Sequence, residues 1–165
     1  MNMSEDLPQH TRLEGIADYT AALDTLCKLA QRNLYLFDQD FDGFGYNTET
    51  RFATLRNFLL AGPAQQLFVL AHDTSYLSTR CPRMMTLLHQ FGTGMFVHQT
   101  PKNLHYISEP FAVSDQGNFV RRFHFDDPRG ILARHDPEQA RTLQSRFLQM
   151  WAVSHPTPST AKLRI

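Results

Sequence analysis

The stretch QLFVLAH, residues 66–72, decides the fold, because it is apolar and has the length of a buried strand. Two similar runs stand before and after it in the chain, NLYLF at residues 33–37 and MFVHQ at residues 95–99. Strands that are apolar throughout are typical of a sheet covered on both faces. Three such strands separated by helices predict a parallel arrangement with right-handed crossovers.

Helical patterns fill the intervals between these strands. Apolar residues keep helical spacing over residues 16–30, behind a capping-box pattern at residues 11–14. A second helix is expected over residues 52–59, before the helix-stopping pair at 62–63. Pro82 is expected to open a third helix. The order of elements is therefore α-β-α-β-α-β.

The last third of the chain has a different pattern. The segments PFAVSD and FVRRFHF flank residues 116–118, which predicts a hairpin. Residues 130–135 favour one more strand, and DPEQ at residues 136–139 begins the last helix with a cap and a first-turn proline. The predicted fold class is α/β, with a mixed, largely parallel sheet and helices on both faces.

The composition is that of one folded domain without a strong net charge. The chain has 165 residues, of which 42% are hydrophobic and 19% charged, with 16 basic and 16 acidic side chains. We expect a flexible tail at residues 1–10, a single α/β domain over residues 11–156 and a second tail at residues 157–165. The polar start lacks the apolar core of a signal peptide, so a cytoplasmic location without membrane contact is expected.

Several segments resemble the phospholipase-D superfamily. The hairpin PFAVSDQGNFV followed by ARHDPEQARTLQSRFLQMW is similar to the closing segment of that superfamily. The segment VLAHDTSYL, followed later by LLHQFGTGMFVHQT, resembles a small uncharacterised bacterial family with this fold, which is sometimes found behind a GNAT-type acetyltransferase domain. The resemblance spans residues 14–155 and implies half of a phospholipase-D-like enzyme, a unit that tends to pair as a homodimer.

The catalytic signature of the superfamily is H-x-K-x₄-D, in which the histidine attacks phosphorus and the lysine steadies the developing charge. Placing the aspartate on Asp115 puts Ser108 and Pro110 in the histidine and lysine positions. The register that starts from His105 also fails at both remaining positions. Serine without a base does not replace an imidazole nucleophile, and proline carries no charge. The resemblance therefore implies a non-catalytic member with a binding, regulatory or assembly role, as a homodimer or with a protein partner.

The loop after the first predicted strand has the spacing of a calcium site. Asp38, Asp40, Asp42, Gly43 and Glu49 match the pattern D-x-D-x-D-G-x₅-E. The one cofactor that the sequence points to is therefore a divalent cation, calcium or magnesium, with the four carboxylates as metal ligands. An EF-hand needs a helix before this loop, whereas the preceding run is strand-like. The alternative is an acidic loop that caps the next helix.

Polar residues at the ends of the three predicted strands favour a competing function, an enzyme. The carboxyl ends of parallel strands share one edge of a sheet, so Asp38, Asp40, His72, Asp73 and His98 are expected near one cleft. Imidazole and carboxylate suit acid/base chemistry or metal ligation, which gives a metal- or histidine-dependent phosphoester hydrolase. In a dehalogenase-like reading Asp38 is the nucleophile and Asp40 the acid/base, although the G-D-x-x-x-D pattern of that class does not occur. The same residues also fit as polar caps of loops.

Charged and aromatic residues alternate in the segment FVRRFHFDDPR. Arg121, Arg122 and His124 interleave with phenylalanines, as in some single-strand nucleic-acid binders. Strand alternation explains the pattern equally well, with the odd-numbered phenylalanines on one face and Arg122 and His124 on the other. Because the total charge is neutral, nucleic acid is not expected as a partner.

Overall fold

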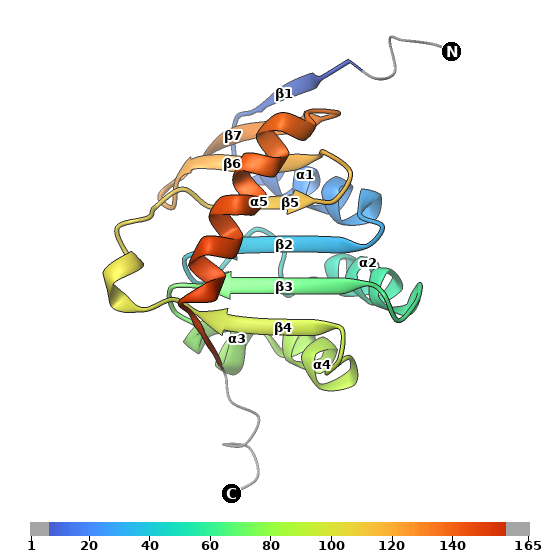
Figure 1. Ribbon diagram of the computed structural model, residues 1–165, viewed down its shortest axis with the longest axis vertical. Coiled ribbons are helices and arrows are strands. Elements are labelled where there is room, and N and C mark those ends of the chain that lie inside the picture. The colour runs from blue at the N-terminus through green and yellow to red at the C-terminus, as the bar shows by residue number, and fades with distance from the viewer. Residues whose placement is uncertain (1–6, 158–165) are drawn as a thin grey trace, which may run out of the picture.

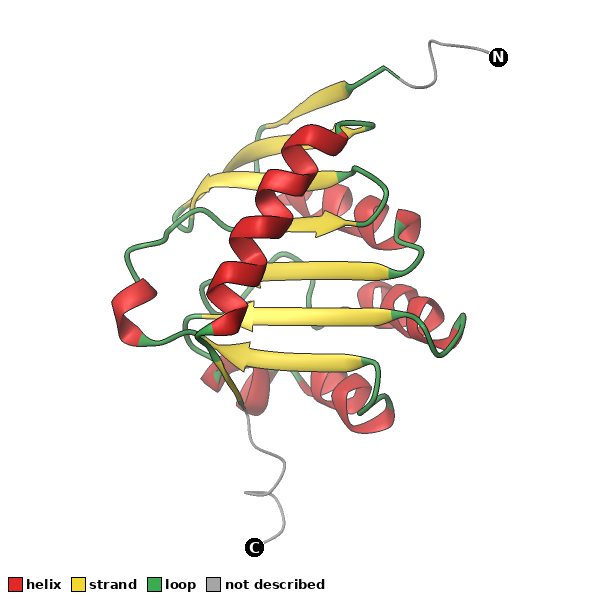
Figure 2. Ribbon diagram, viewed as in Figure 1, coloured by secondary structure: helices red, strands yellow, loops and turns green. Residues whose placement is uncertain are grey.

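The computed structural model describes residues 7–157 as a single sheet with helices on both faces (Figure 2). The strands are β1 (Gln9–Leu13), β2 (Asn33–Asp38), β3 (Gln66–Ala71), β4 (Met95–Gln99), β5 (Phe111–Ser114), β6 (Phe119–His124), β7 (Asp127–Arg134) and β8 (His155–Pro156). The helices are α1 (Ile16–Leu29), α2 (Glu49–Leu60), α3 (Ser75–Arg80), α4 (Pro82–Gln90), the short 3₁₀ helix η2 (Lys102–Leu104) and α5 (Pro137–Ala152).

The strands follow the order β1-β7-β6-β5-β2-β3-β4-β8 across the sheet. β2, β3 and β4 are parallel neighbours, with Tyr35 opposite Phe68 and Phe68 opposite Phe96. The remaining pairs are antiparallel. The β5–β6 hairpin, β7 and β1 extend the sheet beyond β2, and β8 extends it beyond β4. The predicted parallel centre, the hairpin and the α/β class are confirmed.

Two helical layers of unequal size cover the sheet. Helices α1 to α4 pack on one face, and α5 crosses the other face diagonally (Figure 1). Leu34 and Leu36 of β2 face the first layer, while Tyr35 and Phe37 face α5. A shift of one residue in the register of β2 would therefore exchange its two buried sets. Within residues 7–157 no helix combines the length and the apolar character needed to cross a bilayer.

Side-chain caps start two of the helices. The Thr48 hydroxyl accepts the backbone N–H of Arg51 at 3.2 Å and begins α2. The Asp136 carboxylate accepts the N–H of Gln139 at 3.2 Å, with a proline in the first turn of α5, as predicted. Asp136 also lies 2.8 Å from the His10 ring, so the cap ties α5 to β1.

The structure corrects the predictions at the N-terminal end of the domain. The capping box predicted at residues 11–14 is wrong, because these residues lead through β1, and Gly15 precedes α1 without a side-chain cap. Gln9 and His10, which fall in the predicted tail, pair with β7. The pairing with a distant strand is what the local pattern does not reveal.

Two further differences concern short elements. The sequence does not predict α3, which is short and polar and has Leu77 as its buried residue. Thr157 falls in the predicted C-terminal tail, yet its backbone N–H donates to the carbonyl of Val97 at 3.0 Å. The other predicted tail residues, 1–6 and 158–165, lie outside the described residues.

Gly130 of β7 lies where any side chain would collide with β6. A Cβ at this position would fall 2.0 Å from the carbonyl oxygen of Arg121. We expect Gly130→Ala to lower the free energy of unfolding by more than about 3 kcal/mol, because the two strands must separate. Gly92→Ala is the control, since no atom lies within 4 Å of its added Cβ, and it should change stability by less than about 1 kcal/mol. Urea denaturation of both variants tests this, and equal effects would contradict the close strand approach.

Candidate functional site

The carboxyl ends of β2, β3 and β4 meet at one edge of the sheet, termed here the carboxyl edge (Figure 1). Asp38 is the last residue of β2, His72 and Asp73 follow β3, and Thr100 follows β4. Residues 101–110, which include η2, run past this edge on the way to β5. The polar residues that the sequence places at the strand ends therefore do lie at one edge, and their contacts decide what they can do.

Asp38 forms a buried ion pair with Arg122 of β6. The guanidinium Nη2 of Arg122 lies 3.3 Å from Oδ1 of Asp38, and both side chains are less than a tenth exposed, at 3% and 8%. The same carboxylate oxygen accepts the backbone N–H of Gln39 at 2.7 Å. Burial raises the pKa of Asp38 to about 6, although the Arg122 charge and the Gln39 hydrogen bond both act to lower it.

The guanidinium of Arg122 also holds the turn between β6 and β7. Its Nη1 donates to three backbone carbonyl oxygens, those of His124, Phe125 and Asp127, at 3.4, 2.7 and 3.3 Å. The ring centroids of Phe44 and Tyr19 lie 4.0 and 5.3 Å from its Cζ, which are distances of cation–π contacts. Arg122 therefore joins β2, the acidic loop, α1 and the β6–β7 turn through one side chain.

The acidic loop, residues 39–48, turns its aromatic side chains inward. Phe41 and Tyr46 are buried, and the Tyr46 ring lies 4.9 Å from the guanidinium carbon of the buried Arg51. Phe41 and Phe44 have φ angles of 64° and 55°, a conformation that aromatic residues rarely adopt. The Phe44 ring packs on Arg122, and the Phe41 ring packs on Tyr46, which in turn lies over Arg51; these contacts hold the backbone in this conformation.

The predicted metal ligands have separate roles in the structure. Asp38 pairs with Arg122, Asp40 accepts the backbone N–H of Asp42 at 3.0 Å, and Glu49 lies in the first turn of α2. Among residues 7–157 no three His, Cys, Asp or Glu side chains gather as a metal site. The calcium or magnesium site therefore stays a prediction from the spacing, without support from the arrangement of its carboxylates.

His72 packs on the α5 side of the sheet, whereas Asp38 meets Arg122 on the α1 side. The His72 ring lies against Phe37 of the α5-side core at 5.2 Å. Its Nε2 lies 2.7 Å from the carbonyl oxygen of Ile107, and its Nδ1 lies 2.6 Å from the Thr100 hydroxyl. Because a carbonyl only accepts, Nε2 carries the proton and Nδ1 accepts from Thr100. Both nitrogens of His72 are engaged, and burial lowers its pKa, which keeps it neutral.

Asp73 and His98 make contacts of their own. The Asp73 carboxylate accepts hydrogen bonds from the hydroxyl and the backbone N–H of Ser75 at the start of α3, and these bonds lower its pKa. His98 stacks on Trp151 of α5, with 3.7 Å between the ring centroids. The structure thus does not bring the five candidate catalytic residues into one cleft. It uses them to cap turns and to pack α5 on the sheet.

The positions of the superfamily signature are filled by residues that support the backbone. The carbonyl oxygens of Ser108 and Pro110 accept backbone N–H groups from the β6 side at 2.8 and 3.0 Å. Asp115, at the far end of β5, accepts the backbone N–H groups of Gln31 and Arg32 at 3.4 and 3.3 Å. Asp115 therefore stabilises the connection between α1 and β2, which lies at the other end of the strands from the carboxyl edge.

A groove of about 580 Å³ opens beside Ser108, between the segment 104–109 and α5. We term it the α5 groove. Tyr106 and Glu109 line one wall, and Arg146 and Gln149 of α5 line the other. Its position next to the carboxyl edge is where open α/β sheets usually bind ligands.

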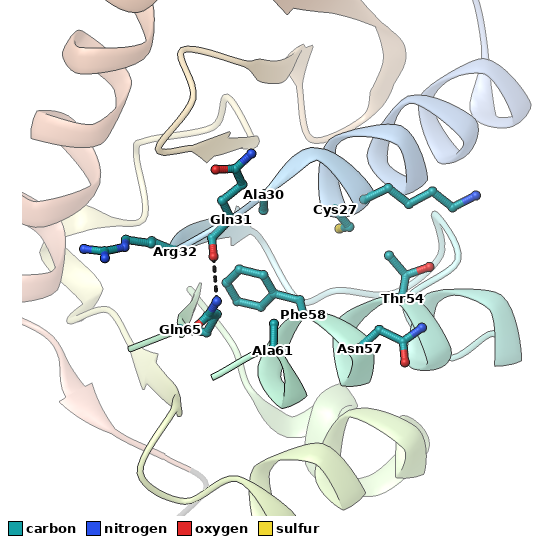
Figure 3. Close-up of a pocket in the computed structure, with 10 residues that line it drawn as sticks. Cys27, Ala30, Gln31, Arg32, Thr54, Asn57, Phe58, Ala61 and Gln65 are labelled. Atoms are coloured by element: carbon teal, nitrogen blue, oxygen red, sulfur yellow. Dashed lines mark hydrogen bonds between the residues drawn. The ribbon is translucent and has the colours of Figure 1, made fainter. Parts of the chain in front are cut away.

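A second groove of about 570 Å³ lies at the opposite edge, between the end of α1 and α2 (Figure 3). Cys27 and Phe58 line it, and the side-chain amide of Gln65 donates to the carbonyl of Gln31 at 2.9 Å across it. Burial raises the pKa of the Cys27 thiol to about 11, so this thiol is not a nucleophile at neutral pH. The α5 groove is therefore the stronger candidate for a functional site.

Residues 15–163 match the family described as Domain of unknown function (DUF7931). The chain belongs to this family. A comparison of the DUF7931 chain with curated proteins finds no match. The family assignment alone therefore does not indicate an activity.

Solved structures share the fold of this DUF7931 domain at low sequence identity. TrmBL2, an archaeal chromatin protein with a novel mode of DNA binding, aligns with a TM-score of 0.67 and 12% identity over 89% of this chain and 53% of its own. Nuc from Salmonella typhimurium, a phospholipase D family member, aligns with a TM-score of 0.67 and 10% identity over 93% of this chain and 100% of its own. Phosphatidylserine synthase from Haemophilus influenzae Rd KW20 aligns with a TM-score of 0.63 and 12% identity over 96% of this chain and 41% of its own.

These likenesses confirm a phospholipase-D-like fold. This chain spans about half the length of TrmBL2 and all of Nuc. The predicted link to an acetyltransferase domain is not tested by them, and neither are the predicted homodimer and protein partner.

The prediction that nucleic acid is not a partner is overturned. A chain with the same fold is a DNA-binding chromatin protein, so this scaffold is compatible with nucleic acid. The error lay in arguing from a neutral total charge, because a site depends on the local charge of its surface and not on the sum over the chain.

Sequence reasoning missed the role of Arg122. The segment FVRRFHF predicts a charged strand, but it does not show that one arginine is buried and the other half-exposed. The signal was present in the alternation, since Arg122 shares a face with Val120, which belongs to the α1-side core. Tyr106 and the α5 groove have no local signature at all, because the groove forms between segments far apart in the chain.

We expect Arg122→Met to lower the free energy of unfolding at pH 7 by at least about 3 kcal/mol, because it leaves Asp38 without a counter-charge and three carbonyls without a donor. Arg121→Met is the matched control on the same strand. Arg121 faces the α5 side and forms a partly exposed pair with Glu109, so its loss should cost about 1 kcal/mol or less. Thermal and chemical denaturation measure the stability of both variants. A small effect of Arg122→Met would contradict the stabilising role of the buried Arg122 contacts.

The raised pKa of Asp38 predicts a pH dependence of stability. Asp38 has a pKa of about 6 in the folded protein, whereas in the unfolded chain it has the ordinary aspartate pKa of 3.8. Between these values the folded state binds more protons, so raising the pH from 4 to 7 should lower the stability of the wild type relative to Asp38→Asn. The relative loss is on the order of 3 kcal/mol. Urea denaturation of both proteins across this range provides the measurement, and parallel curves would show that Asp38 titrates normally.

Proposed function

We propose that this domain binds nucleic acid in the α5 groove and does not hydrolyse phosphodiesters. The observation that carries the proposal is the identity of the residues beside the groove. Ser108 and Pro110 stand where the superfamily signature has its histidine and lysine, so a phosphodiester in the groove would meet neither a nucleophile nor an ammonium group.

The polar side chains near the groove already have hydrogen-bond or ion-pair partners, which supports a domain that does not hydrolyse phosphodiesters. His72 uses one ring nitrogen on a carbonyl and the other on a hydroxyl, so it is not free to attack phosphorus or to activate Ser108. Asp38 is covered by Arg122 on the other side of the sheet. A hydrolase that used either residue would first have to break buried interactions.

The choice of nucleic acid rests on the fold and on the local charge. The fold is shared with the DNA-binding protein TrmBL2. Arg146 lines the α5 groove, and Arg141, five residues earlier on α5, lies beside Glu138 in the shallow hollow that continues from it. The carboxylate of Glu109 in the groove wall is matched by Arg121 at 3.3 Å. The groove therefore offers exposed guanidinium groups to phosphates.

Binding of fluorescein-labelled oligonucleotides, single-stranded and duplex, tests the proposal by fluorescence anisotropy. We expect Arg146→Ala to weaken binding severalfold and to reduce the slope of log K against log salt by about one, as for the loss of one phosphate contact. The control is Arg56→Ala, an exposed arginine of α2 on the other side of the sheet, which should bind like the wild type. Equal affinities of the two variants, or no binding by the wild type at low salt, would refute the proposed site.

A further inference from the structure

Two large aromatic side chains stand exposed beside the α5 groove. Tyr106 is 78% exposed and Phe123 is 47% exposed, which sets them apart from the buried aromatic core of the domain. Tyr106 lines the groove itself, so a ligand bound there would contact its ring. The proposed function uses only the charges of this groove and leaves these rings without a role.

The backbone brings Phe123 close to the groove wall that contains Tyr106. Hydrogen bonds from Arg122 N to Pro110 O and from Phe125 N to Ser108 O align the segment before β5 with the end of β6. Phe123 therefore lies next to Glu109, which forms a wall of the groove, and Tyr106 lies three residues earlier in the same wall. The bulge of β6 between Arg122 and His124 interrupts the strand alternation at this point and leaves Phe123 exposed opposite Glu109, while Phe125 packs against the α5-side core.

The few arginines near these rings can bind only a small number of phosphate groups. Arg121 is matched by Glu109, which leaves Arg141 and Arg146 as the guanidinium groups of the groove and its continuation. Duplex binders commonly neutralise about 6–10 phosphates, and their affinity depends on that term. A nucleic acid bound to this surface must therefore gain affinity from contacts with the aromatic rings as well as from the arginines.

We infer that the α5 groove takes single-stranded nucleic acid, with unpaired bases stacked on Tyr106 and Phe123 and a phosphate on Arg146. This inference rests on the proposed function and specifies its ligand. Bases inside a duplex present only their edges, so the two rings cannot stack on them. Unpaired bases expose their faces, and stacking on an aromatic side chain tolerates any sequence.

The test compares one labelled twelve-nucleotide thymidine strand alone and annealed to its complement, by fluorescence anisotropy at fixed salt. We expect the free strand to bind at least about tenfold more tightly than the duplex. Tyr106→Ala and Phe123→Ala should each weaken binding of the free strand by about fivefold or more, while Tyr106→Phe, which keeps the ring, should bind as the wild type does. Leu60→Ala, at an exposed apolar residue of α2 on the opposite layer, is the control for a general loss of apolar surface.

The outcomes separate this inference from the proposed function. Equal or tighter binding of the duplex, with Arg146→Ala still harmful, would overturn the single-strand inference and leave the nucleic-acid site standing. If Tyr106→Ala and Phe123→Ala bind the free strand as the wild type does, the inferred stacking is overturned, and the nucleic-acid site again stands. Absence of binding to either oligonucleotide would overturn both proposals.

Discussion

The buried guanidinium of Arg122 is the constraint on which the carboxyl edge depends. It contacts Asp38 at the end of β2, the rings of Tyr19 and Phe44, and three carbonyl groups of the β6–β7 turn. A charge in the interior is costly unless it is paired and hydrogen-bonded, so the surrounding segments must stay in place around it. The positive φ angles of Phe41 and Phe44 fit this view, because unfavourable backbone conformations persist only where packing overrides them.

The same constraint fits the proposal that this phospholipase-D-like scaffold binds a ligand without hydrolysing it. On the α1 side of the edge, Arg122 pairs with Asp38. On the α5 side, His72 holds the segment before β5 through the carbonyl of Ile107. The polar groups at the strand ends therefore stabilise loops, and the open surface that remains is the α5 groove with Tyr106, Glu109 and Arg146. In the proposed binding role, the ligand contacts that surface and leaves the buried pairs intact.

The sequence reveals the elements of this fold more readily than its site. Runs such as NLYLF and QLFVLAH carry their strand signal locally, and the cap at Asp136 is a local hydrogen bond, so both are predictable. β1 is not, because only its pairing with β7 makes it a strand. The acidic spacing from Asp38 to Glu49 matches a calcium loop in sequence, but the structure directs Asp38 to an arginine more than eighty residues away. Ion pairs and grooves made by distant segments leave no pattern in a single stretch of chain.

The central claim is that the carboxyl edge is a structural assembly and not a catalytic centre. The most direct measurement is the turnover of a phosphodiester and a phosphomonoester substrate by the purified protein, in magnesium, manganese, calcium and chelator. The account predicts rates no greater than the buffer background, and identical rates for Asp38→Ala and the wild type. Turnover above background that Asp38→Ala or a substitution of His72 abolishes would contradict it.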